Sequence, residues 1–367
     1  MDFEAECDTD WGVVPDILLV TIFQYLSDAD RGRAARVCKR WAQISHSPCL
    51  WRKRIMRLGA VDAVEERKAL RFAQLYGSHL RHLTIYCSKR RGNTRKRFQR
   101  VMCQILEHLA TGQCQLIDLN IPRMEFYRFW RFDFYREKLL KSVCRFLHCQ
   151  NSLRSFNMHA ARLNIFSGSQ LLEAVADGSG QTLEVLNIED YYHDMIQCFR
   201  VPKFVNTLKK FTNLSILYLN YNYISDFVLC LLADNCGGKL RYLSIKVHRK
   251  DPHSHVTEKS SWRLLTNTCP ELGVAVEFDH IGTYRDISAI LVPGIPLKCL
   301  QPTIPEYCIY LILNISALKR LHVCANGDNE QKRLEVQEIT NKYQAMLQTQ
   351  NLDFRFFTDI IFEEEEE

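Results

Sequence analysis

The chain has 367 residues, of which 47% are apolar and 25% are charged, enough to bury a sizeable core in about two domains. Its net charge of +6 is modest for this length and is partly offset by an acidic tail at 363–367, so charge alone does not indicate nucleic-acid binding. The acidic start at 1–6 and the lack of a long apolar run predict a cytosolic or nuclear protein with no membrane partner.

The first predicted helix begins at Pro15, whose missing N–H costs nothing in a first helical turn, and Asp16 suits the positive end of that helix. Its apolar positions make a stripe wider than one neighbouring helix can cover, which predicts a partner: Leu18, Leu19, Ile22, Phe23 and Leu26.

A second helix is predicted after Ser27, which is a good N-cap, and a further amphipathic turn carries Val37, Cys38 and Trp41. Three short helices in fewer than fifty residues make a module too small to be very stable alone. These side chains therefore either form the core of a small helical domain or dock onto a partner.

The order Val37-Cys38-Lys39-Arg40-Trp41, then Leu50-Trp51, together with the Pro15-Asp16 opening, resembles the F-box over residues 13–51. The resemblance implies docking onto a Skp-family adaptor, and through it onto a cullin, in a ubiquitin ligase. Two departures, Val14 for the usual leucine and Arg31 in an acidic-Leu position, are expected to weaken adaptor affinity. The implied adaptor-binding residues are Pro15, Leu18, Leu19, Ile22, Phe23, Leu26, Val37, Cys38 and Trp41.

After a linking helix near 64–76, the pattern Leu-x-x-Leu-x-Ile/Leu recurs six times at intervals of 26 to 37 residues. The copies start at Leu80, Leu116, Leu153, Leu183, Leu214 and Leu240. Each begins with strand-like alternation and continues with helical spacing, which predicts an α/β solenoid. Weaker copies at 272, 297 and 318 suggest that the array decays towards its C-terminal end.

The unit at 214–236, with Asn222 at its turn, resembles a leucine-rich repeat, and the longer, less regular units resemble the divergent repeats of F-box only proteins. A doubly wound α/β domain is the alternative, since strand and helix alternate in both.

In a solenoid the odd strand residues face the concave surface, which is the predicted site for a protein substrate. An Asn at the same place in three successive units either grips a peptide or forms an amide ladder within the sheet. An acidic and aromatic loop at 189–194 either contacts substrate or caps a turn. The candidate substrate residues are His82, Asn120, Asn157, Asn187, Tyr218, Tyr242, Asp190 and Tyr191.

Two other segments have open roles. A basic cluster spans Lys89–Arg100 and is a nuclear-import signal, a clamp for an acidic or phosphorylated substrate, or a solvated helix face. An aromatic and arginine-rich segment at 124–135 exceeds what one helix can bury, so part of it is predicted to form an exposed interface edge.

No catalytic, metal or cofactor site is predicted. The fifteen cysteines include no Cys-x-x-Cys, and His248, His253 and His255 with Asp251 lack the fixed spacing of metal ligands. No phosphate loop, nucleophile elbow or zinc-protease motif is present, and no single cysteine stands out as a nucleophile.

The predicted organisation is a short helical F-box at 11–57, a linking helix at 58–79, a leucine-rich-repeat solenoid at 80–328, a helix-and-strand cap at 329–362 and an acidic tail at 363–367. The leading hypothesis is a non-catalytic substrate receptor of a Skp, cullin and F-box ubiquitin ligase. The alternatives are an adaptor-bound scaffold that drives no ubiquitylation and a nucleic-acid-associated repeat protein.

Overall fold

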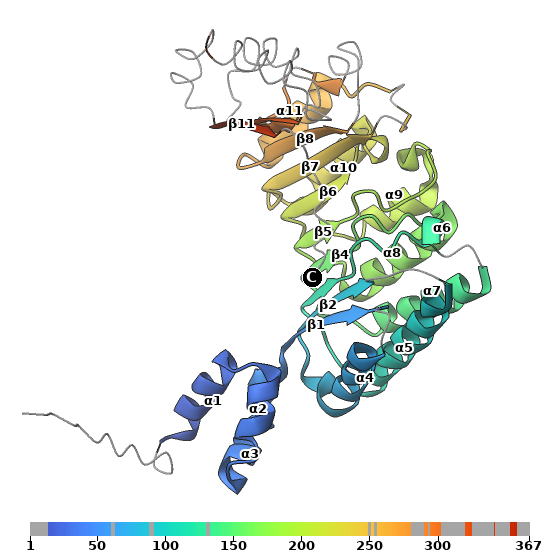
Figure 1. The fold of residues 1–367 in the computed structure, drawn as a ribbon. Coiled ribbons are helices and arrows are strands. Elements are labelled where there is room, and N and C mark those ends of the chain that lie inside the picture. The colour runs from blue at the N-terminus through green and yellow to red at the C-terminus, as the bar shows by residue number, and fades with distance from the viewer. Residues whose placement is uncertain are drawn as a thin grey trace, which may run out of the picture.

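The protein consists of a small N-terminal helical unit followed by a long curved array of strands and helices (Figure 1). This computed structural model describes residues 14–59, 63–87, 92–129, 133–248, 251–252, 255–279, 290–292, 294–301, 320–324, 341 and 353–357. No helix within these ranges is long and apolar enough to cross a membrane.

The N-terminal unit contains the three predicted helices: α1 (Asp16–Tyr25), α2 (Asp28–Ala34) and α3 (Lys39–Ser45). The 3₁₀ turn η1 (Pro48–Trp51) closes it. Ser27 caps α2, since its hydroxyl accepts a hydrogen bond from the Asp30 N–H at 3.2 Å, and the Cys38 thiol caps α3 in the same way. The predicted helix starts are therefore confirmed.

One parallel sheet organises the rest of the described chain. Its strands pair in chain order: β1 (Lys53–Leu58), β2 (His82–Cys87), β3 (Asp118–Asn120), β4 (Ser155–Asn157), β5 (Val185–Asn187), β6 (Ile216–Asn220), β7 (Tyr242–His248), β8 (Gly273–Asp279), β9 (Leu297–Gln301), β10 (Arg320–Cys324) and β11 (Asp353–Phe357). The six regular repeat strands predicted from the sequence are all present. The weaker copies also form strands, so the sheet continues where the sequence suggested decay.

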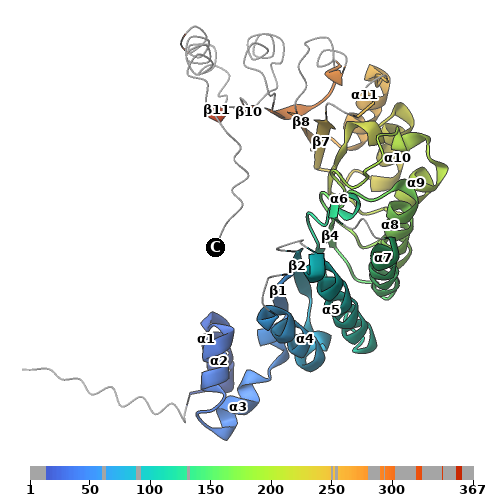
Figure 2. The same cartoon turned by 45° about the vertical axis from the view of Figure 1, so that its right-hand side comes forward.

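Helices follow the strands on the outer side of the sheet: α4 (Val64–Tyr76), α5 (Gly92–Thr111), α6 (Phe126–Phe129), α7 (Asp133–His148), α8 (Ile165–Ser179), α9 (Pro202–Leu208), α10 (Asp226–Cys236) and α11 (Lys259–Thr268). Short 3₁₀ turns add η2 (Gly77–His79), η3 (Cys198–Arg200) and η4 (Tyr221–Tyr223). Figure 2 shows the helices outside the arc and the strands lining its inner face. A doubly wound domain would cover both faces with helices, so the solenoid prediction is confirmed.

The array begins earlier than the sequence suggested. Strand β1 pairs in parallel with β2, with Met56 opposite Ile85, so α4 is a repeat helix rather than a linker. The boundary predicted at 80 was wrong because the Lys53–Leu58 segment, with three basic residues among six, does not read as a repeat strand. Of the helix-and-strand cap predicted at 329–362, the structure describes residue 341 and strand β11, and the acidic tail lies outside the described residues.

The N-terminal unit is packed against the first repeat through Trp51. Its indole donates a hydrogen bond to the Ser45 carbonyl at 2.8 Å and stacks on Tyr76 of α4 at 4.2 Å between ring centroids. Phe72 meets the same indole edge to face at 5.8 Å. Aromatic stacking of this kind adds to area burial, so the Leu-Trp part of the motif joins the two units.

Buried amides link successive repeats at the turns that precede the strands. The Gln150 side chain donates to the Cys114 carbonyl at 3.0 Å and accepts from the Leu116 N–H at 2.8 Å, and it is 1% exposed. Gln115 makes the reciprocal pair of bonds from the other repeat. Its half-buried side chain donates to the Cys149 carbonyl and accepts from the Asn151 N–H. Water can replace the bonds of Gln115 but not those of Gln150.

Gln150→Leu is expected to lower the free energy of unfolding by roughly 2 to 4 kcal/mol, because it leaves a buried N–H and a buried carbonyl without partners. Gln115→Leu, with the same bonds in contact with solvent, is expected to cost less than about 1 kcal/mol. Urea unfolding followed by circular dichroism measures both. Equal losses in the two variants would contradict the role assigned to burial.

Candidate functional site

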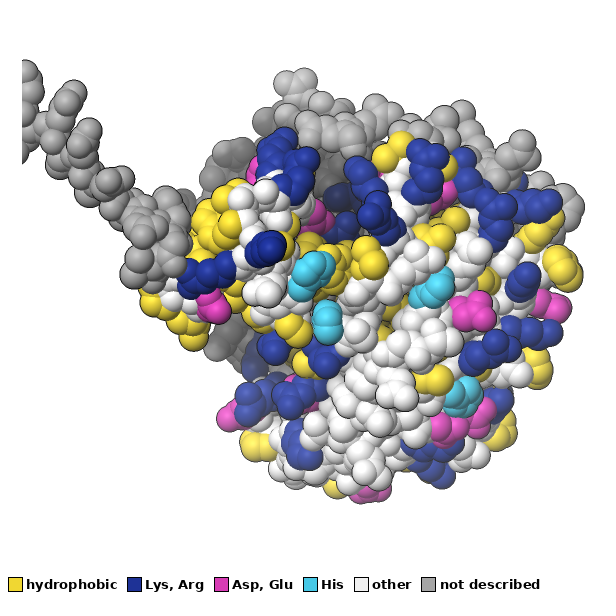
Figure 3. All heavy atoms as spheres, turned by 90° about the horizontal axis from the view of Figure 1, so that it is seen from below, with side chains coloured by type: hydrophobic (Ala, Val, Ile, Leu, Met, Phe, Trp, Pro, Cys, Tyr) yellow, Lys and Arg dark blue, Asp and Glu magenta, His cyan; other side chains and the backbone are white. Residues whose placement is uncertain are grey.

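The clearest exposed apolar surface lies on the N-terminal helical unit. Helix α1 and the turn before α3 present five large apolar side chains to solvent: Ile17 (74% exposed), Leu18 (52%), Ile22 (39%), Tyr25 (87%) and Val37 (65%). Figure 3 views the molecule from the end where α1–α3 lie and shows hydrophobic side chains gathered there beside basic ones. We call these five residues the apolar docking face.

Helix α1 carries two stripes rather than the single wide one predicted. Leu19 and Phe23 are 0% and 1% exposed and form the core of the unit, so their prediction as surface contacts was wrong. Ile17 and Tyr25 were missed, although they share the outward stripe of Leu18 and Ile22 at helical spacing. The core of such a small unit needs its own apolar residues, which leaves only the outer stripe for a partner.

The other predicted adaptor contacts differ in exposure. Pro15, Val37 and Cys38 are exposed, and Leu26 and Trp41 are half-buried. The Trp41 ring packs edge to face on Phe23 at 5.4 Å between centroids, so Trp41 supports the core of the unit as well as reaching its surface.

The unusual Arg31 holds the helical unit together. Its guanidinium donates to the carbonyls of Phe23 (2.7 Å), Gln24 (3.0 Å) and Leu50 (3.0 Å). The first two carbonyls lie in the last turn of α1, where helical partners run out. The residue that departs from the F-box pattern therefore closes α1 against η1 and fixes the apolar docking face.

The concave face of the sheet is a second candidate surface. The predicted outward residues are half-buried while their neighbours are fully buried, as in the pattern of Asp118, Leu119 and Asn120. The register places Thr84, Asn120, Asn157, Asn187, Tyr218 and Ser244 in one row across six strands. His82 and Tyr242 belong to the adjacent row, so the sheet brings the predicted strand residues together.

The asparagine row is partly used by the protein itself. The Asn157 side-chain carbonyl accepts from the His159 N–H at 2.9 Å, and that of Asn187 accepts from the Glu189 N–H at 3.1 Å. These bonds shape the turns after the strands, as Asx turns do. The side-chain oxygen of Asn120 has no hydrogen-bond partner among the described residues. The bonds of Asn157 and Asn187 stay within one repeat each and form no ladder between strands, and peptide binding by the row stays a prediction.

An apolar and aromatic patch lies beside the asparagines. Tyr218 and Tyr242 meet edge to face at 5.7 Å, and Val185 and Ile216 continue the row of Tyr242. All four are half-buried on the concave face. Half-buried tyrosines supply a large contact area at low entropic cost, so this patch suits protein recognition.

Asp190 and Tyr191, in the acidic and aromatic loop after β5, are buried, which corrects their prediction as substrate contacts. Tyr191 is 0% exposed and donates a hydrogen bond to the Gly168 carbonyl at 2.9 Å. Burial raises the pKa of its hydroxyl. Asp190 is 4% exposed and accepts from Asn220 at 3.2 Å. The loop was misread because its charges, which usually indicate exposure, are neutralised by a lysine from a distant repeat.

That lysine is Lys246 of β7. Its ammonium lies 3.1 Å from Asp190, 3.6 Å from Glu189, 3.7 Å from Glu277 and 3.8 Å from Asp279, and its side chain is 11% exposed. We call these five residues the Lys246 cluster. It lies on the concave side, where β5–β8 end. No local pattern in the sequence indicates it, because its members come from three separate repeats.

The charges in the Lys246 cluster shift one another's protonation. Burial lowers the pKa of Lys246, but the four carboxylates favour its charged form more strongly, so its pKa lies above the ordinary value. Burial raises the pKa of Glu189, to about 7, against the opposing effect of Lys246. For Asp190 burial acts in the same direction, but Lys246 and Arg162 outweigh it and hold the pKa below its ordinary range.

The basic cluster, the aromatic segment and the histidine group predicted from the sequence are only partly covered by the described residues. Lys89–Arg91, His253 and 130–132 lie outside the described residues. Arg97 pairs with buried Glu66 at 2.5 Å, and His255 stacks on Tyr221 at 4.6 Å. His248 lies 3.8 Å from Asp279. Among the described residues, no group of three or more His, Cys, Asp or Glu side chains is arranged to hold a metal ion.

Known proteins share both parts of this architecture. Residues 11–57 match the F-box-like family. The chain is 28% identical over 352 residues to F-box/LRR-repeat protein 21 of Mus musculus, covering 87% of this chain and 71% of that protein. The protein of the same name from Ovis aries is 27% identical over 338 residues, covering 88% and 73%. The chain thus carries an F-box-like domain ahead of a leucine-rich-repeat array. The narrower likeness that its irregular units suggested, to F-box only protein 39, is not confirmed by these relatives.

Glu189→Gln tests the electrostatics of the Lys246 cluster. Because the folded pKa of Glu189 is near 7 and its ordinary value is 4.5, the folded chain binds a proton there between these pH values that the unfolded chain does not. Stability from this group therefore falls as pH rises from 5 to 8. The variant is expected to lose that fall and to gain about 1 to 3 kcal/mol over the wild type at pH 8, but little at pH 5.

Urea unfolding at the two pH values measures the difference. Glu184→Gln, on a half-exposed glutamate beside the same strand, is the matched control and should keep the slope of the wild type. A Glu189→Gln variant with an unchanged slope would contradict the assignment.

Proposed function

We propose that this F-box and leucine-rich-repeat chain is the substrate-recognition subunit of a Skp, cullin and F-box ubiquitin ligase. The observation that carries the proposal is the apolar docking face, which lies on the domain that matches the F-box-like family and is exposed while the core of that domain is complete. A Skp-family adaptor covers this face, and the cullin is reached through the adaptor.

The adaptor contact is a helix-in-groove interaction. Ile17, Leu18, Ile22 and Tyr25 repeat along α1 at the spacing with which an amphipathic helix enters an apolar groove. Val37 lies before α3 and extends the same apolar face. Exposed large apolar side chains gathered in one place indicate a protein interaction site rather than ordinary surface.

The solenoid is positioned by the packed junction between the two units. Trp51, Phe72 and Tyr76 form a continuous aromatic contact from the F-box to α4, and Arg54 of β1 bonds to Asp28 of α2. A docked adaptor therefore holds the repeat array at a defined angle. This rigidity suits a receptor that must present a bound protein to the ubiquitin-charged partner on the cullin, where the other subunits carry out catalysis.

The concave face supplies the substrate surface in this proposal. Support comes from the half-buried Tyr218 and Tyr242 beside the asparagine row, with His82 at the N-terminal side of the sheet. The cytosol or the nucleus is the proposed location, where the adaptor and cullin act.

The triple variant Leu18→Ala, Ile22→Ala, Val37→Ala tests the docking face. Co-expression of the full chain with a Skp-family adaptor and a cullin, followed by co-purification, is expected to give a complex with the wild type. The variant should bind at least about a hundredfold more weakly, because central apolar anchors carry most of the energy of such an interface. All three side chains are exposed in the free chain, so the variant should keep its fold.

The matched control truncates three exposed apolar residues of the solenoid: Phe166→Ala, Phe227→Ala, Val256→Ala. It should bind the adaptor as the wild type does. Equal binding by both variants would overturn the assignment of the docking face. A wild-type complex that supports no ubiquitin transfer to any bound partner would favour the scaffold alternative instead.

A further inference from the structure

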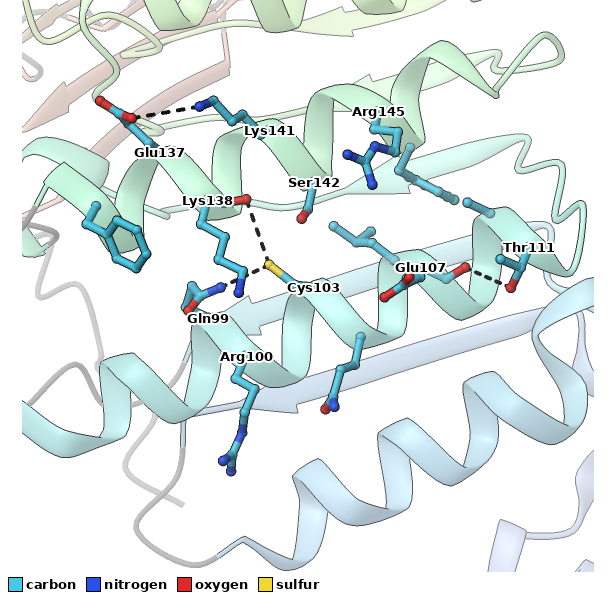
Figure 4. Close-up of a pocket in the computed structure, with 15 residues that line it drawn as sticks. Gln99, Arg100, Cys103, Glu107, Thr111, Glu137, Lys138, Lys141, Ser142 and Arg145 are labelled. Atoms are coloured by element: carbon cyan, nitrogen blue, oxygen red, sulfur yellow. Dashed lines mark hydrogen bonds and ion pairs between the residues drawn. The ribbon is translucent and has the colours of Figure 1, made fainter.

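A groove of about 630 Å³ lies between α5 and α7 on the outer side of the array (Figure 4). Its floor is apolar, formed in part by the buried side chains of Leu106 and Phe146 and by the half-buried Cys103. Neither the apolar docking face nor the concave face includes any of these residues. The groove is therefore a third surface, separate from the two used in the proposed function.

The walls of the groove combine the two sequence segments whose role was open. Arg100, the last residue of the basic cluster, lines it from α5, and Phe134, near the end of the aromatic segment, lines it from α7. The Phe134 ring is 72% exposed. On α7 the lining residues Phe134, Lys138, Lys141 and Arg145 follow at steps of four, three and four, so they share one helix face.

The polar rim of the groove is mainly basic. Four cationic side chains and two carboxylates line it, and one carboxylate, Glu137, lies 4.0 Å from Lys141. Within the described part of the chain, Arg100, Lys138 and Arg145 form no ion pair. Figure 4 shows Lys138 and Ser142 directed from α7 towards Cys103 of α5.

We propose that this groove binds an acidic amphipathic segment of a partner protein. A helix from the partner would place apolar side chains on the floor against Phe134 and Cys103, and its carboxylates would meet Lys138 and Arg145. From Phe134 to Arg145 the wall is about 16 Å long at the rise of an α-helix, which matches about three turns of a bound helix. Charge complementarity selects acidic segments over neutral or basic ones of the same shape.

The test uses the full chain and a fluorescein-labelled acidic peptide of about four helical turns, with leucines at positions i, i+4 and i+7 and glutamates elsewhere. Binding is measured by fluorescence anisotropy. Lys138→Glu with Arg145→Glu is expected to weaken binding by about tenfold or more, since like charges then face each other. The matched control reverses two exposed cations of the neighbouring helix α4, Arg67→Glu with Arg71→Glu, and should change affinity little.

A second pair of variants tests the apolar contact. Phe134→Ala is expected to weaken binding, whereas Phe166→Ala, which truncates a similarly exposed phenylalanine on α8, should not. A peptide with lysines in place of the glutamates should not bind. Adaptor co-purification of all four variants should match the wild type, which separates this surface from the docking face.

Three results would overturn the proposal. The first is an acidic peptide that does not bind the wild-type chain. The second is an equal loss of affinity in the Lys138→Glu, Arg145→Glu variant and the Arg67→Glu, Arg71→Glu control. The third is binding by the lysine peptide as tight as by the acidic one. Loss confined to the Lys138, Arg145 and Phe134 variants would support it.

Discussion

The whole array depends on one ladder of apolar side chains. Leu83, Leu119, Phe156, Leu186, Leu217 and Leu243 lie opposite one another in the register of the parallel strands, and each is 0% exposed. No single strand-helix unit can bury its own leucine, so each repeat is stable only against its neighbours. The first repeat lacks a preceding unit of this kind, and the aromatic contacts of Trp51 with Phe72 and Tyr76 help to cover it instead. The F-box is thus both a docking unit and the N-terminal cap of the solenoid.

The same alternation that buries the ladder determines what the concave face can carry. The residues that alternate with the buried ones point towards the concave face. Between β5 and β8, the starts of the strands carry the apolar and aromatic patch, and their ends carry the Lys246 cluster. Four carboxylates around one lysine form a net acidic region, even with Arg162 included. Partially buried charges are costly unless they are paired, and here the pairing crosses three repeats. The cluster therefore fixes the relative position of these repeats as well as the sign of the surface potential where the strands end.

The sequence predicted most of the fold because repeat spacing and helix caps are local signals. Six leucine patterns located six strands, and Ser27 and Pro15 located the starts of two helices. The errors share one cause, which is that burial depends on partners distant in the chain. Asp190 and Tyr191 appeared exposed because no local pattern reveals Lys246 or Gly168 as their partners. Leu19 and Phe23 were assigned to the surface because periodicity alone does not say which of two adjacent stripes faces the core. Strand β1 was missed because its basic residues hide a strand of which only Met56 and Leu58 are buried.

Arg31 shows how a departure from a family pattern can be explained by structure. A leucine in that position would add to the apolar core of the helical unit, whereas arginine donates hydrogen bonds to three carbonyls at the ends of α1 and η1. Its guanidinium also lies 5.4 Å from the Trp51 ring, so one side chain connects α1, η1 and the junction with the solenoid. Hydrogen bonds from a charged, 13% exposed group are stronger than neutral ones. Arginine at this position thus replaces apolar burial with directional hydrogen bonds. These bonds hold the end of α1 against η1, and so orient the outer stripe of α1 relative to the repeat array.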